Sequence, residues 1–305
     1  MKLATTPVPA VPAPRAGSGQ LLVLAATVFW GTTGTAQAFA PPGTHPLAIG
    51  AIRLAIGGVT LLLVALLRGL LREQQGWPKG ATLAAAASMA LYQLCFFTGV
   101  ARTGVAIGTM VAIGSSPILA GALGLWLRQE RPSGRWYSAT LLAVVGCILL
   151  GMSSGEVQGD GLGILLALGA GLAYALYAVT SKGLLERHHP DAVVGVVFVL
   201  GAVMLAPLLF WVDLRWLATV RGLAVAMELG LLATAAAYTL YARGLTRIPV
   251  ATAVTLSLGE PLIATLLAVG LLDERLPAVA WGGVALLFAG LLWLSSERAT
   301  SPQYD

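Results

Sequence analysis

Long apolar stretches follow one another along the whole chain, separated by short polar or proline-containing breaks. A membrane-spanning helix needs about 20 consecutive apolar residues. The pattern predicts ten such helices, at residues 20–40, 47–67, 80–100, 104–127, 136–152, 162–182, 191–212, 223–242, 250–271 and 277–294. Because the breaks leave no room for a soluble domain, the predicted fold class is an all-α integral membrane protein.

Composition strengthens this interpretation. Only 10% of the 305 residues are charged and the mean hydropathy is +0.85, whereas a soluble chain carries about 25% charged residues. The net charge of +5 comes from basic residues scattered among the breaks, without the clustered patch that nucleic acid requires. We therefore expect the lipid bilayer, and no nucleic acid, as a partner. Residues 1–19 and 296–305 are interpreted as tails, the first of them disordered.

An internal repeat organises the ten spans. Shifting the chain by 144 residues without a gap superposes matching residues over five spans: Trp30 on Tyr174, His45-Pro46 on His189-Pro190, Pro117 on Pro261, and Glu130-Arg131 on Glu274-Arg275. The chain is thus predicted to form two five-helix halves, residues 20–152 and 162–295. Since five crossings are an odd number, the halves enter the membrane from opposite sides, as inverted repeats around a central cavity.

The distribution of basic residues predicts the orientation. With the N-terminus in the cytoplasm, thirteen of the 18 Lys and Arg residues lie in inside segments and four lie in outside loops. By the positive-inside rule this places both termini in the cytoplasm. The remaining basic residue, Arg53, lies within the second span about two turns from its outer end, where we expect its side chain to snorkel to the interface.

A stripe of polar and aromatic residues marks the candidate cavity. Trp30, Thr33 and Gln37 share one face of the first span, and the shift places Tyr174, Tyr177 and Ser181 at the equivalent positions of the sixth. Inverted repeats commonly bind substrate near the midplane between the halves. These six residues are therefore predicted substrate contacts, together with Tyr92 and Tyr238 of the third and eighth spans. The alternative is that the aromatic rings fill gaps between helices and the small residues allow close packing.

Ser116-Pro117 and Glu260-Pro261 fall at the centres of the fourth and ninth spans. Each proline removes one backbone hydrogen bond and exposes a carbonyl in the preceding turn. A charge at the bilayer centre costs about 2.5–3.5 kcal/mol, so Glu260 is expected to be protonated, paired or facing water. Ser116 and Glu260 complete the set of substrate-binding candidates. A purely structural, protonated Glu260 stays an open alternative, and Glu228 near the outer end of the eighth span is predicted to be structural.

Motifs for enzymatic chemistry are weak. The Gly-x-Ser-x-Gly match at 151–155 follows a membrane helix, whereas a nucleophile elbow needs a strand before it. The three histidines lack metal-ligand spacing, and there is no phosphate-binding Gly-Lys-Ser/Thr loop. We therefore expect no catalytic residue, no metal and no cofactor.

The motifs Phe29-Trp30-Gly31, Ser116-Pro117-Ile118 before Glu130-Arg131, and Glu260-Pro261-Leu262 before Glu274-Arg275 resemble the paired EamA repeats of the drug/metabolite transporter superfamily. The resemblance covers residues 20–295. It implies a ten-helix secondary carrier of a small molecule in a bacterial inner membrane, working by alternating access. Within the superfamily the chain is most similar to bacterial amino-acid exporters, those for aromatic amino acids included.

Charge narrows the substrates that the resemblance allows. A sugar phosphate needs cationic side chains in the cavity, and only Arg53 lies well inside a span. A neutral amino acid suits the aromatic and hydroxyl side chains better. Glu260 keeps open a second class, a small-cation or drug exchanger driven by protons. A non-transporting scaffold or enzyme is the third alternative, and for the oligomeric state a monomer is favoured.

Overall fold

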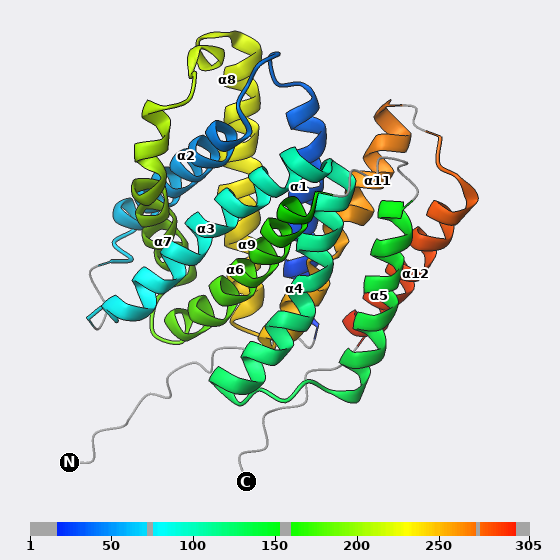
Figure 1. The fold of residues 1–305 in the computed structure, drawn as a ribbon. Coiled ribbons are helices and arrows are strands. Elements are labelled where there is room, and N and C mark those ends of the chain that lie inside the picture. Colours follow the sequence, from blue (N-terminus) through cyan, green and yellow to red (C-terminus); the bar gives the residue numbers. More distant parts are fainter. Residues whose placement is uncertain (1–16, 72–75, 153–159, 273–274, 297–305) are drawn as a thin grey trace, which may run out of the picture.

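The computed structural model describes residues 17–71, 76–152, 160–272 and 275–296, and within them all regular structure is helical (Figure 1). Ten helices or helix pairs in these ranges are long and apolar enough to cross a membrane. Each of their ends lies within three residues of the sequence prediction. The predicted ten spans are therefore confirmed. The predicted tails and the Gly-x-Ser-x-Gly match lie largely outside the described residues.

The first half consists of five continuous helices: α1 (Ser18–Ala38), α2 (Pro46–Leu67), α3 (Lys79–Thr103), α4 (Val105–Arg128) and α5 (Gly134–Met152). The second half is more irregular. It contains α6 (Gly161–Leu185), α7 (Pro190–Leu205), α8 (Val220–Met227), the π-helix η3 (Glu228–Ala236), α9 (Ala237–Leu245), α10 (Val250–Leu256), α11 (Gly259–Leu272) and α12 (Ala278–Ser295). Two short 3-10 helices, η1 (Ala206–Phe210) and η2 (Arg215–Ala218), lie between α7 and α8.

The two halves interlock through pairs of helices. Helix α3 packs along α6, α2 along α7, and α5 along α12, while α1 packs against η3, α9 and α11 (Figure 1). Gly146 and Gly290, which the 144-residue shift superposes, allow α5 and α12 to approach closely: a Cβ added to Gly146 would lie 2.6 Å from the backbone nitrogen of Leu287. The main apolar core therefore lies between the repeats.

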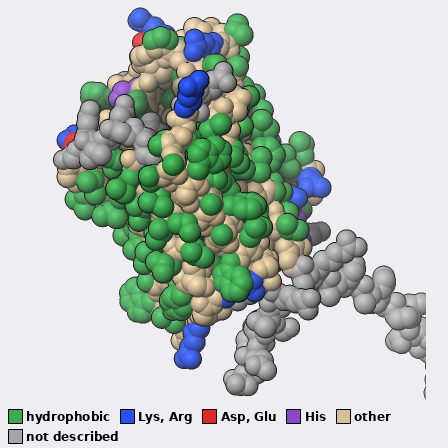
Figure 2. Space-filling model, turned by 90° about the vertical axis from the view of Figure 1, so that its right-hand side faces the viewer, with side chains coloured by type: hydrophobic (Ala, Val, Ile, Leu, Met, Phe, Trp, Pro, Cys, Tyr) green, Lys and Arg blue, Asp and Glu red, His purple; other side chains and the backbone are tan. Residues whose placement is uncertain are grey.

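The outer surface matches a bilayer environment. Hydrophobic side chains cover much of the face shown in Figure 2, and most Lys and Arg side chains lie around its margins. Large apolar side chains such as Leu67, Trp126 and Leu165 are exposed on the helices. In water such a surface would be unfavourable, whereas lipid tails solvate it well.

The two central prolines have different effects on their helices. In α4 the helix continues through Pro117, and the hydroxyl of Ser116 donates a 2.8 Å hydrogen bond to the carbonyl of Ile113 that the proline leaves without a donor. The ninth span is instead broken between α10 and α11, and the carbonyl of Ser257 accepts the backbone N–H of Glu260 at 3.0 Å. The break places Glu260 in the first turn of α11.

Candidate functional site

A cavity of about 500 Å³, including the space open to solvent, lies between the two repeats. Seven of the residues predicted from sequence line it: Trp30, Thr33, Tyr92, Ser116, Tyr174, Tyr238 and Glu260. Arg53, Phe96, Ala112, Ile113 and Ser257 complete the lining. The cavity thus draws on helices from both halves, as the inverted-repeat fold leads one to expect.

Aromatic rings form much of the cavity wall. Trp30 and Tyr174, the superposed pair of the two repeats, face each other edge to face with their ring centroids 6.4 Å apart. The ring centroid of Tyr238 lies 5.0 Å from that of Trp30, and the ring centroid of Tyr92 lies 5.8 Å from that of Tyr174. The hydroxyl of Tyr174 is 2.9 Å from that of Ser257, at the break in the ninth span. The symmetry-related aromatic residues therefore meet at the interface of the halves.

Arg53 lies in this cavity, and the prediction that it snorkels to the membrane interface is wrong. Its side chain is buried, with only 7% of the residue exposed. The Nε atom donates to the hydroxyl of Thr234 at 3.1 Å, and Nη2 donates to the carbonyl of Ala233 at 3.2 Å. Because the guanidinium has these partners on η3, it stays inside the protein. A charged residue in an apolar span is a functional candidate by default, and that signal was available in the sequence.

The π-helix explains why η3 holds Arg53. A π-helix pairs each N–H with the carbonyl five residues earlier and commonly occurs at functional sites. Here the hydroxyl of Thr234 donates to the carbonyl of Leu229, five residues earlier, at 2.7 Å, while its oxygen also accepts from Arg53. The sequence pattern predicted a regular eighth span, because apolar periodicity does not distinguish a π segment from an α-helix.

Glu260 contributes an acidic side chain to the cavity that contains the basic side chain of Arg53. It lines the same cavity from α11 and is near enough to Arg53 to interact with it electrostatically. The 144-residue shift places Ser116 at the position of Glu260, and Val197 at the position of Arg53. Each ionisable group is therefore present in one repeat only, and the cavity has a cationic side chain from the first half and a carboxyl group from the second.

Three of the predicted contacts lie off the cavity lining. Gln37 is half-buried on α1, one turn beyond Thr33. Tyr177 and Ser181 of α6 are almost completely buried, and the ring of Tyr177 packs 5.9 Å from that of Tyr238. Tyr177 thus supports a cavity-lining ring from behind, which is the packing alternative considered for this stripe.

Helices of the two halves are joined at the face where α1 begins and α12 ends, hereafter the terminal face. There α10 packs against α4, α5 and α6. Lys182 of α6 donates from Nζ to the carbonyls of Leu245 and Ile248, at 2.5 and 2.9 Å. The carboxylate of Glu130 accepts the backbone N–H of Val250 at 2.8 Å. Polar contacts therefore hold the start of α10 against the first half of the chain.

The opposite face lacks the equivalent closure. The repeat superposes α6 on α1, and the α9–α10 connection on the α3–α4 connection. Lys182 therefore corresponds to Ala38, which has no ammonium group to donate, and Ile248 corresponds to Gly104. In the described part of the chain, α11 packs mainly on α1 and α12, and its contact with α4 is slight at most. The contacts that join α10 to the first half therefore have no equivalent of the same extent at the related position in the described residues.

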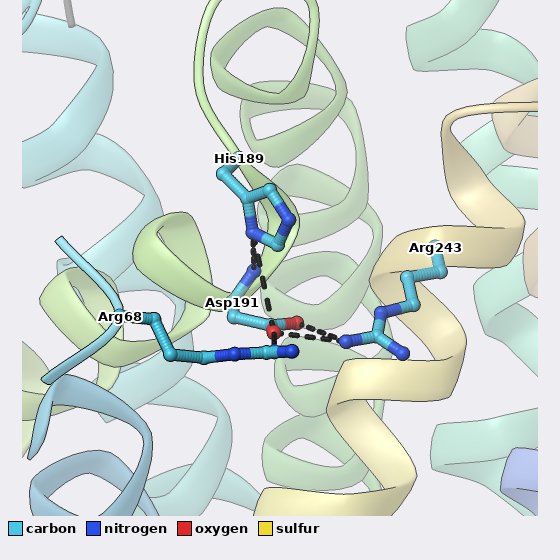
Figure 3. Close-up of polar contacts among 4 residues, drawn as sticks. All are labelled: Arg68, His189, Asp191 and Arg243. Atoms are coloured by element: carbon cyan, nitrogen blue, oxygen red, sulfur yellow. Dashed lines mark hydrogen bonds and ion pairs between the residues drawn. The ribbon is translucent and has the colours of Figure 1, made fainter. Parts of the chain in front are cut away.

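A second ionic cluster lies at the terminal face (Figure 3). The carboxylate of Asp191 on α7 is almost fully buried and accepts two hydrogen bonds from Nη2 of Arg243 on α9, at 2.8 and 2.9 Å. Arg68 directly follows α2, and its Nη1 atom lies 3.5 Å from Oδ2 of the same carboxylate. The Nδ1 atom of His189 accepts the backbone N–H of Asp191 at 3.3 Å and caps α7. This cluster joins the ends of three helices.

Glu228, at the first position of η3, accepts a 2.5 Å hydrogen bond from the hydroxyl of Thr32 on α1. Thr32 neighbours the cavity-lining Thr33, so Glu228 lies behind the cavity wall. This contact agrees with a structural role for the carboxyl group in joining α1 to η3.

Comparison with known proteins identifies the class. The sequence matches the EamA-like transporter family over residues 17–152 and again over residues 161–296. The two matches together cover most of the chain. The chain belongs to the EamA-like transporter family and is a multi-pass membrane transporter of the drug/metabolite transporter superfamily.

Individual relatives agree with this class. The chain is 48% identical over 277 residues to the uncharacterized transporter YwfM of Bacillus subtilis (strain 168), which covers 90% of this chain and 93% of YwfM. It is 32% identical over 136 residues to the uncharacterized transporter sll0355 of Synechocystis, covering 43% of this chain and 40% of the relative. A solved crystal structure superposes with a TM-score of 0.78 at 22% identity, covering 90% of this chain and 96% of its own, which shows the shared fold.

Proposed function

We propose that this transporter exports neutral amino acids, aromatic ones included, across a bacterial inner membrane by alternating access. The observation that carries the proposal is the make-up of the cavity: one guanidinium and one carboxyl group, from opposite repeats, in an aromatic wall. A neutral amino acid has the complementary make-up, because it combines a carboxylate, an ammonium group and an apolar or aromatic side chain.

Charge balance favours a zwitterion over an anion. A doubly charged phosphate needs several cationic donors, and Arg53 is the single Lys or Arg in the described cavity lining, which also contains the carboxyl group of Glu260. Substrates of little net charge and small size suit such a site. Aromatic rings contribute apolar contact and edge-to-face packing to an aromatic substrate side chain.

The proposed orientation assigns the conformational state of the carrier. Placing the terminal face in the cytoplasm agrees with the excess of Lys and Arg in the segments there. The structure then corresponds to the outward-open state. Export requires the reverse state, in which α11 closes against α4 while α10 separates from it.

A proton-driven exchanger of small cations is the second candidate, because Glu260 lines the cavity. Arg53 in the same cavity disfavours it, since a cationic substrate would be repelled by the guanidinium. The two candidates differ in their substrates and are therefore separable by one assay.

The test is uptake into proteoliposomes that contain the purified full-length chain, with and without a pH gradient. We expect labelled leucine or phenylalanine to be transported above empty liposomes, and tetraphenylphosphonium and glucose 6-phosphate to stay at the background level. Flux of the sugar phosphate equal to that of phenylalanine would overturn the proposal. Transport of the organic cation without any amino acid would establish the second candidate.

A further inference from the structure

We infer that Arg53 and Glu260 form a two-pole recognition site in which Arg53 binds the substrate carboxylate and Glu260 binds the substrate ammonium group. The inference rests on the proposed amino-acid transport and adds to it the chemical requirement: both charged groups must be present on one small molecule. It assigns the specificity of the carrier to a residue pair that the internal repeat does not duplicate.

The hydrogen bonds of Arg53 leave one side of its guanidinium for a ligand. Thr234 and Ala233 accept from Nε and Nη2. No described residue accepts a hydrogen bond from Nη1. The side chain is buried and lines the cavity, so a cavity ligand is the remaining partner. Arginine suits a carboxylate because its planar fork presents several donors in a fixed geometry.

A second donor in the same cavity also lacks a partner. The indole Nε1 of Trp30 is buried and has no hydrogen-bond acceptor among the described residues. A buried Trp N–H normally has one. Trp30 and Arg53 both line this cavity, and an acceptor-rich group such as a carboxylate bound there would give their free donors a partner.

The two poles differ in depth. Arg53 lies seven residues after the start of α2, about 10 Å below the open face at 1.5 Å per residue. Glu260 lies ten residues after the start of α10, at the break in the ninth span near the middle of the membrane. A bound amino acid therefore has a defined orientation, with its carboxylate toward the open face and its ammonium group toward the centre.

A structural role for Arg53 is the competing explanation. In that case the guanidinium only donates a hydrogen bond to the carbonyl of Ala233 and interacts with the charge of Glu260. The two explanations differ in one measurable respect: a structural arginine affects all ligands equally, whereas a carboxylate-binding arginine affects only those that carry a carboxylate.

The experiment uses three ligands of similar shape: phenylalanine, phenethylamine without the carboxylate, and 3-phenylpropionate without the ammonium group. Each competes with labelled phenylalanine in counterflow in proteoliposomes and is titrated against the purified chain by tryptophan fluorescence. In the unmodified protein we expect both truncated ligands to bind at least tenfold more weakly than phenylalanine.

The variants test each pole. Arg53→Gln should weaken the binding of phenylalanine and 3-phenylpropionate at least tenfold and leave the binding of phenethylamine within about twofold, because only the first two ligands lose a charge-assisted hydrogen bond. Glu260→Gln should weaken the binding of phenylalanine and phenethylamine and leave the binding of 3-phenylpropionate unchanged. Arg53→Lys keeps the charge and should restore part of the binding. Arg215→Gln removes an equal charge at a side chain that is 94% exposed and should change nothing.

The outcomes separate this inference from the proposed function. Phenylalanine and phenethylamine binding equally to the unmodified protein would overturn the role of Arg53 and leave amino-acid transport standing, even if Arg53→Gln fails to fold. Binding of 3-phenylpropionate alone, lost in Arg53→Gln, would overturn amino-acid transport and support the carboxylate site. If Arg53→Gln weakens the binding of all three ligands equally, Arg53 has a structural role only.

Discussion

At the scale of single residues, the cavity combines an aromatic pair that the repeat relates with two charged-type side chains that it does not duplicate. Trp30 and Tyr174 are related by the repeat, whereas Arg53 and Glu260 have Val197 and Ser116 at the related positions. Symmetric residues suit the exchange of conformations between the halves. Asymmetric residues suit the recognition of a substrate that is itself asymmetric.

The first prediction at this scale concerns proton dependence. Glu260→Gln keeps the shape of the side chain but removes its ability to gain or lose a proton. We expect the folded protein to reach the membrane and transport to lose its pH dependence, with a moderate loss of rate. Transport rates from pH 5.5 to 8.5 measure this. A cation/proton exchanger would instead lose exchange almost completely.

Glu228→Gln is the matched control for this experiment, because Glu228 also lies within a membrane span and bonds to Thr32 rather than facing the cavity. Its pH profile should match that of the unmodified protein. If Glu260→Gln also leaves rate and pH profile unchanged, Glu260 has a structural role only.

A second residue-scale prediction concerns Trp30. Trp30→Phe keeps an aromatic ring in the cluster and removes the indole N–H that has no acceptor among the described residues. We expect a threefold to tenfold rise in KM for phenylalanine with little change in thermal stability, because one donor to the substrate is lost. An unchanged KM together with a lower unfolding temperature would assign the ring to packing alone.

At the scale of elements, breaks in regular helices lie beside the functional groups. The π-helix η3 holds Arg53, and the interruption between α10 and α11 places Glu260 at a helix start. The related span in the first repeat, α4, stays continuous through Pro117. Proline alone therefore does not break a span; the hydrogen-bond partner available to the freed carbonyl differs between the two helices.

The ends of α2, α7 and α9 depend on Asp191. Asp191→Asn removes the charge that two arginines contact and should lower the free energy of unfolding by about 1–3 kcal/mol. The effect should be somewhat smaller at high salt, because the two arginines are partly exposed and are therefore screened. Thermal unfolding in detergent measures this. Asp213→Asn, at a side chain that is 65% exposed, should change stability by less than about 0.5 kcal/mol. Equal effects of the two variants would show that the cluster contributes no stability.

At the scale of the whole molecule, polar contacts join the two halves at the terminal face. Lys182 bonds two carbonyls in the α9–α10 connection, and the related position in the first repeat is Ala38. We therefore expect these polar contacts to stabilise the conformation seen here.

Removal of the hydrogen bonds that Lys182 donates should make the terminal face open more often. In a chain whose two cysteines, Cys95 and Cys147, are replaced by alanine, Ser181→Cys reports access from the terminal face, because Ser181 is only 2% exposed in this state. Lys182→Met should raise the labelling rate by a water-soluble maleimide at least threefold. Lys79→Met, at an exposed lysine of the same face, is the control. Equal labelling of both variants would show that Lys182 does not hold the closed state.

Sequence alone determined the ten spans, the repeat and most of the cavity-facing aromatic residues. These depend on local quantities: the length of an apolar run sets a bilayer crossing, and a fixed register relates the two halves. Trp30 and Tyr174 were identified because the repeat carries one onto the other, before any contact between them was known.

The tertiary structure decided which charged groups face the cavity. The position of Arg53 depends on acceptors from Thr234 and Ala233, far away in sequence, which the packing of α2 on η3 brings within hydrogen-bond distance. The burial of Tyr177 and Ser181, and the closure of one face by Lys182, likewise depend on contacts between helices of different halves. Apolar periodicity records which residues avoid water, but the partner of a buried polar group is a property of the assembled fold.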